Sequence, residues 1–121
     1  MHEEDVLAFL SATVKSLWAL ELLLLMRREC SRAWQVAALV AELRASTVVV
    51  QDALAGLIGA GLIAEDEAGI FCYRPVSETL DSFVAETQTL YAAKPLAVIN
   101  AIAAAPNEKL RIFSDAFRLK D

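Results

Sequence analysis

The chain contains one histidine, His2, and two cysteines, Cys30 and Cys72, which stand far apart and form no CxxC pair. With a single imidazole at the end of the chain, neither a histidine-based metal site nor a Ser-His or Cys-His nucleophile can be assembled. Isolated thiols of this kind are typical of reduced, half-buried small side chains. The clustered glycines follow a predicted helix and not a strand, so they match neither a P-loop nor a dinucleotide fingerprint. The sequence therefore predicts no enzyme, no metal and no cofactor.

Positive charge is also scarce. Lys and Arg are absent from Ala45 to Tyr73, and the whole chain has a net charge of −5. This balance argues against a general affinity for nucleic acid or for anionic membranes. No uninterrupted apolar run approaches the roughly 20 residues that a membrane span needs. The first five residues are acidic where a secretory signal is basic. We therefore expect a cytoplasmic protein without a membrane partner.

Apolar residues are abundant, at 57% of 121 residues, which excludes an intrinsically disordered chain. This apolar excess has two interpretations, a buried homodimer interface or a helical protein whose many alanines inflate the count. The length predicts one domain, 1–121. Its expected parts are an N-terminal helix in 1–15, a core in 16–75, and C-terminal helices in 76–121 that could form a dimer interface.

Apolar periodicity predicts a mostly α fold with a small β-hairpin. We expect Ser16, Ser46 and Ser77 to cap helices, because serine hydroxyls accept hydrogen bonds from free amides at helix starts. The expected helices cover Glu3–Lys15, Leu17–Arg28, Trp34–Arg44, Thr47–Gly59, Ser77–Ala93 and Pro95–Ala105, with short strands on both sides of Glu65–Asp66–Glu67. A last amphipathic helix is expected after Asn107, with Leu110, Ile112, Phe113, Phe117 and Leu119 on its apolar side.

The expected helix Thr47–Gly59 has an apolar side and an outward side. Its inward residues are Val50, Ala53, Leu54 and Leu57, and its outward residues are Val48, Val49, Gln51, Asp52, Ala55 and Gly56. Glycines at 59 and 61 are expected to end it, because glycine adopts the left-handed conformation at low cost.

Three segments together resemble the bacterial winged helix-turn-helix regulators of the broad MarR-like group. They are Trp18–Met26, the turn at Ser46, and Leu57–Ile63, and the likeness extends over about Ser16–Pro75. The resemblance implies that Thr47–Gly59 is a recognition helix, that the hairpin is a wing, and that the protein regulates transcription by binding DNA. A symmetric DNA reader of this kind is also expected to be a homodimer.

The predicted recognition helix offers few groups that read DNA. Thr47 and Gln51 fit that role, since glutamine can pair with adenine, and Val48 or Val49 can touch a thymine methyl group. Asp52 would face the phosphates with the wrong sign. The acidic turn would likewise be repelled from a minor groove, where wings usually place Arg or Lys.

The available cations lie outside this stretch, at Arg27, Arg28, Arg32, Arg44 and Arg74. They have two interpretations, contacts to the DNA backbone or ordinary cations that stabilise helix ends. The function therefore also has two interpretations. The first is a DNA-binding regulator that uses Thr47, Val48, Gln51 and nearby arginines. The second is a protein-interaction module whose apolar and acidic face docks on a partner with a basic surface.

Overall fold

The computed structural model describes residues 2–103, which form six helices and one two-stranded antiparallel sheet. The elements are α1 (Glu3–Thr13), α2 (Leu17–Arg28), α3 (Val36–Leu43), α4 (Thr47–Gly59), β1 (Ile63–Glu65), β2 (Phe71–Tyr73), α5 (Glu78–Ala93) and α6 (Pro95–Ala103). The mostly α fold with a small hairpin is thus confirmed. The helix expected after Asn107 lies outside the described residues.

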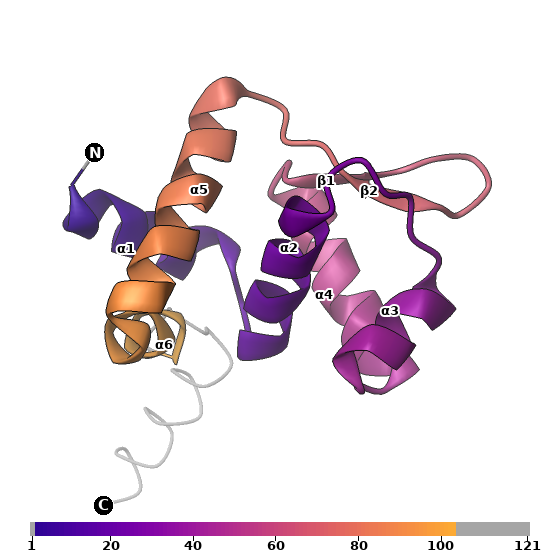
Figure 1. The fold of residues 1–121 in the computed structure, drawn as a ribbon, viewed down its shortest axis with the longest axis horizontal. Coiled ribbons are helices and arrows are strands. Elements are labelled where there is room, and N and C mark those ends of the chain that lie inside the picture. Colours follow the sequence, from indigo (N-terminus) through magenta and orange to yellow (C-terminus); the bar gives the residue numbers. More distant parts are fainter. Residues whose placement is uncertain (1, 104–121) are drawn as a thin grey trace, which may run out of the picture.

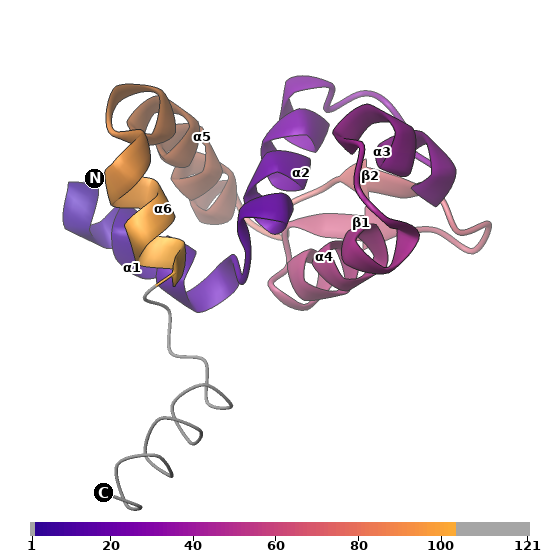
Figure 2. The same ribbon diagram turned by 90° about the horizontal axis from the view of Figure 1, so that it is seen from below.

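Helix α2 is the centre of the fold. On one side of it α1, α5 and α6 pack together, and on the other side lie α3, α4 and the β1–β2 hairpin (Figures 1 and 2). All residues of α2 from Ala19 to Met26 are buried except Glu21, as expected for a helix that is apolar nearly all round. Leu17 and Trp18, at its start, are instead exposed.

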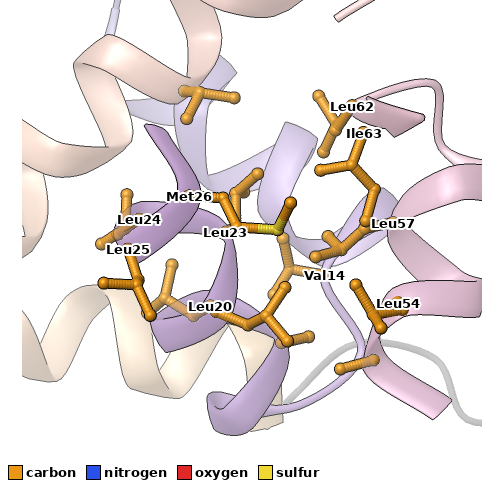
Figure 3. Packing of buried hydrophobic residues seen from close by; sticks show 14 of the residues in the cluster. Val14, Leu20, Leu23, Leu24, Leu25, Met26, Leu54, Leu57, Leu62 and Ile63 are labelled. Carbon is orange, nitrogen blue, oxygen red and sulfur yellow. The ribbon is translucent and has the colours of Figure 1, made fainter. Parts of the chain in front are cut away.

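The core between α2 and α4 fixes the position of α4. Leu20, Leu23 and Met26 of α2 belong to one buried cluster with Leu54 and Leu57 of α4 (Figure 3). Leu62 and Ile63 extend the same cluster to the start of the hairpin. The hairpin is therefore attached to α4 through apolar burial as well as through the chain.

All three expected serine caps are confirmed. The Oγ atoms of Ser16, Ser46 and Ser77 accept hydrogen bonds from backbone amides three residues ahead, at 3.0 to 3.2 Å. Helix α1 is shorter than expected, because Val14 is extended and the helix ends at Thr13 instead of Lys15.

The start of α3 was predicted wrongly. The periodicity predicts a helix from Trp34, but α3 begins at Val36 and Trp34 forms an antiparallel bridge with Phe71. The Trp34 amide donates to the Phe71 carbonyl at 2.7 Å, and the Phe71 amide donates back at 2.8 Å. The Trp34 side chain is fully buried in the same core. A partner distant in sequence has therefore overridden the local helical pattern.

Among the described residues, no single helix is long and apolar enough to cross a membrane; α1 and α2 meet the test only as a pair bent by 110°.

Candidate functional site

Helix α4 presents a buried side to α2 and an exposed side to solvent. Val50, Ala53, Leu54 and Leu57 are buried, which confirms the predicted inward set. The last turn closes with Gly61 at φ 78°. Its amide donates to the Ile58 carbonyl, and the Leu62 amide donates to the Leu57 carbonyl. This pair of bonds satisfies carbonyls that the helix end leaves free and leads the chain directly into β1.

The exposed side of α4 is formed by uncharged and small residues, apart from Asp52. Thr47, Val48, Gln51 and Ala55 are exposed, with Val48 at 66%. Val49 is half-buried, because it forms part of a groove against the start of α2. We call the residues Thr47, Val48, Gln51, Asp52 and Ala55 the α4 face.

On one side of the α4 face lies an apolar groove of about 300 Å³, between α4 and the α1–α2 connection. Trp18, Val49 and Gly56 line it, and Lys15 and Asp52 place opposite charges in the same groove. The Lys15 ammonium also donates to the Ala12 carbonyl at 2.9 Å, at the end of α1.

On the other side lies a second groove, between α4 and the hairpin, with a volume of about 360 Å³. We call it the hairpin groove. It is lined by Val36, Gln51, Leu54, Ala55, Ile58, Glu65, Gly69 and Phe71. Sequence reasoning did not single out Ile58, whose side chain is 37% exposed. The spacing of Gln51, Ala55 and Ile58, at i, i+4 and i+7, places them on one side of a helix and could have indicated it.

The hairpin turn is acidic, but its three carboxylates have different surroundings. The Asp66 Oδ1 atom accepts hydrogen bonds from the amides of Ala68 and Ile70, at 2.8 and 3.0 Å, and so stabilises the turn. Glu65 and Glu67 are exposed, and Glu65 is opposite Phe71 in the β1–β2 register. Glu65 therefore places negative charge directly at the hairpin groove.

The five arginines named as possible ligand contacts lie in different surroundings. Arg28 shares a depression between α2 and α3 with Glu21 and Glu42. Arg74 follows β2 at the end of the hairpin away from the turn, where its amide donates to the Leu62 carbonyl. These positions do not bring Arg28 and Arg74 together with the α4 face.

Arg32 precedes α3 and Arg44 follows it. The Arg32 guanidinium forms an ion pair with Glu29 at 3.3 Å, and its central carbon lies 3.6 Å from the centroid of the Trp34 ring. Arg44 is exposed in the tight turn that leads into α4, with a left-handed backbone at φ 54°. Arg44 is thus the arginine placed closest in sequence to the amino-terminal end of α4.

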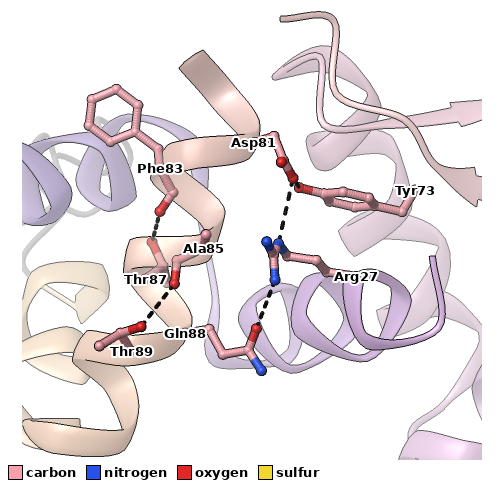
Figure 4. A network of polar contacts seen from close by, with 8 residues as sticks. All are labelled: Arg27, Tyr73, Asp81, Phe83, Ala85, Thr87, Gln88 and Thr89. Atoms are coloured by element: carbon pink, nitrogen blue, oxygen red, sulfur yellow. Dashed lines mark hydrogen bonds and ion pairs between the residues drawn. The ribbon is translucent and has the colours of Figure 1, made fainter. Parts of the chain in front are cut away.

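Arg27 takes part in a polar network within the protein, shown in Figure 4. Its Nε atom lies 3.5 Å from Asp81 Oδ1, and one of its terminal nitrogens donates to Gln88 Oε1 at 3.1 Å. The Tyr73 hydroxyl donates to the same Asp81 oxygen at 2.6 Å. These contacts link α2, β2 and α5, and they make Arg27 a structural residue instead of a ligand contact.

Burial, followed by the hydrogen bond to Asp81 and the charge of that carboxylate, raises the pKa of Tyr73 well above its ordinary value near 10. The folded state therefore favours the neutral phenol. Its stabilising contribution is present below pH 10 and is lost as the pH rises, because the unfolded tyrosine ionises first.

We expect Tyr73→Phe to be less stable by about 1 kcal/mol at pH 7.5, through the lost hydrogen bond. Between pH 9 and pH 11 its stability should fall less steeply than that of the wild type. Urea unfolding of both proteins across this range measures the difference, and parallel curves would contradict the assignment.

Within residues 2–103, no three His, Cys, Asp or Glu side chains are grouped as a metal site would require. No family model, no curated protein and no solved structure matches this chain.

Proposed function

We propose that this chain is a winged helix-turn-helix regulator of transcription, in which α4 is the recognition helix and the β1–β2 hairpin is the wing. The observation that carries the proposal is the exposed amino-terminal half of α4, held by a tight turn after α3. The order α2, Trp34–Phe71 bridge, α3, α4, β1, β2 supports it, because a helix-turn-helix pair followed by a hairpin is the arrangement of winged helices.

The side chains at this end of α4 fit the surface of a DNA major groove. The Gln51 amide can donate to and accept from an adenine edge, and the Val48 methyl groups can contact a thymine methyl group. Thr47 lies in the first turn of α4, where free amides and a hydroxyl favour a phosphate. Ala55 is small enough to let the helix backbone approach the base pairs.

Phosphate contacts are the weak part of this interface. Arg32 and Arg44 provide about two contacts per subunit, while Glu65 and Glu67 keep the hairpin turn away from the backbone. A homodimer formed through α1, α5 and α6 would double the count to about four. With about four phosphate contacts, log affinity is expected to fall against log salt with a slope of roughly −4.

The test is a titration of the full chain with labelled genomic fragments at 50 and 200 mM salt, followed by fluorescence anisotropy. We expect affinity to fall roughly 200-fold between the two salt concentrations. Arg44→Asn should weaken binding to all fragments and reduce the slope by about 2 for a dimer, since asparagine tolerates the left-handed backbone but carries no charge.

Arg74→Gln is the matched control, because it removes one arginine at the far end of the hairpin and should leave the slope unchanged. If the wild type binds no fragment at 50 mM salt, the proposal of DNA binding is wrong.

The charge distribution favours a second candidate, a winged helix that docks on a protein. The exposed carboxylate of Glu65 lines the groove beside α4, that of Glu67 follows in the hairpin turn, and the sequence has no Lys or Arg from Ala45 to Tyr73. A basic protein surface would be attracted to this region, whereas the DNA backbone would be repelled from it. In this case α4 and the hairpin keep their roles as the contact elements, and only the class of ligand changes.

A further inference from the structure

We propose that the hairpin groove binds a polypeptide segment of a partner protein that presents one apolar side chain between Lys or Arg residues. This inference rests on the second candidate function and names the chemistry of its partner. It locates the contact in one groove, so that it can be tested without knowledge of the partner's identity.

The base of the hairpin groove selects an apolar side chain. Leu54 and Phe71 are buried, and Val36 is half-buried beside them. Ile58 adds a partly exposed apolar side chain from α4. A leucine or phenylalanine placed here would remove its own apolar surface and that of Ile58 and Val36 from water, which is the main source of affinity in such grooves.

The rim of the groove selects positive charge. Glu65 lies on the rim at the end of β1, and Glu67 follows it in the turn. The third acid, Asp66, is held by the amides of Ala68 and Ile70, so the turn keeps its shape when a ligand approaches. A Lys or Arg residue next to the apolar anchor would therefore face the Glu65 carboxylate, and further cations would be attracted to Glu67 in the adjacent turn.

Another residue that lines the groove, Gln51, connects peptide binding with DNA binding. The Gln51 side chain lines the hairpin groove and is also the best base-reading group of the α4 face. A partner seated in the groove would cover it. Protein and DNA would thus compete for α4, and the partner would release the chain from DNA if both candidate functions operate.

The test uses the full chain labelled with ¹⁵N and a synthetic peptide in which one leucine stands between two pairs of arginines. We expect the amide signals of Ala55, Ile58 and Gly69 to shift on titration. A peptide with serine in place of the leucine should lose this effect, which separates anchoring from general charge attraction. The double variant Glu65→Lys/Glu67→Lys should weaken binding of the leucine peptide by about tenfold or more, since like charges then face each other.

Glu78→Lys is the matched control, because it changes the charge of an exposed residue in the first turn of α5 and should leave peptide binding unchanged. Equal shifts with the serine peptide, or shifts confined to other parts of the chain, overturn the proposal. The same is true if raising the protein concentration alone shifts the groove signals, because the occupant is then a second copy. Binding of DNA fragments by the double variant Glu65→Lys/Glu67→Lys distinguishes this inference from the proposal of DNA binding. If the double variant binds DNA more tightly than the wild type and the wild type does not bind the peptide, the groove proposal is wrong and the proposal of DNA binding stands.

Discussion

Replacing Leu57 with alanine is expected to lower the free energy of unfolding by about 3–5 kcal/mol, the largest effect of any change considered for this protein. Leu57 is fully buried between α4 and α2, in the cluster that also contains Met26 and Leu62. Truncation removes apolar burial and leaves a cavity, and helices attached on both sides limit how far the site can collapse. Its carbonyl also accepts a hydrogen bond from the Leu62 amide at the end of the helix. Leu57 therefore contributes both to the core and to the turn that leads into β1.

Urea unfolding followed by circular dichroism measures this loss, and the neighbouring Ile58→Ala is the control. Ile58 is 37% exposed, so the same kind of truncation there should cost well under half as much. Similar losses for the two variants would show that α4 does not pack on α2 by the side described here.

Replacing Gly61 with alanine is expected to cost about 1–3 kcal/mol, because any side chain is strained at its φ of 78°. The added methyl group would also lie 3.0 Å from Val76 Cγ2, which is closer than ordinary carbon contacts. Since Gly61 joins α4 to β1, the strain should also disturb the hairpin. Thermal or urea unfolding gives the magnitude, and hairpin amide shifts in NMR spectra show where the change is felt.

A glycine within α4 itself, Gly56, provides a control of opposite sign. Gly56 is in the interior of α4, and apart from its chain neighbours and the backbone of its own helix, no described atom lies within 4 Å of the position its Cβ would take. Gly56→Ala should therefore stabilise the protein by roughly 0.5–1 kcal/mol, because alanine restricts the unfolded chain and favours the helix. If both substitutions destabilise equally, the left-handed turn is not the cause of the loss at Gly61.

Local patterns in the sequence were sufficient to predict most of the helical architecture. Each serine cap precedes a periodic apolar segment, and both signals act within one or two turns of chain, so they can be read without a tertiary structure. The same is true of α4, whose buried and exposed sides follow directly from the spacing of Val50, Leu54 and Leu57. The exposed residues of the candidate site could be predicted from the same helical spacing.

Long-range partners account for what the sequence did not predict. Trp34 leaves the predicted helix because Phe71 offers it a complete pair of backbone hydrogen bonds. Arg27 has the same local features as Arg28, yet only Arg27 meets Asp81 and Gln88 from α5. The grouping of the arginines, and hence which of them remain near α4, depends on helix packing and has no signal in the spacing of charges.

The Trp34–Phe71 bridge leads us to expect a particular order of events in folding. It closes a long loop of chain that contains α3, α4 and β1. Closing such a loop costs entropy that increases with its length, and contacts between residues far apart in sequence form slowly. The packing of α3 against α4 involves a much shorter separation, and we expect it to come first. A newly synthesised chain is therefore expected to form α4 before the hairpin groove exists, and a ligand that contacts only α4 would be bound earlier than one that contacts both.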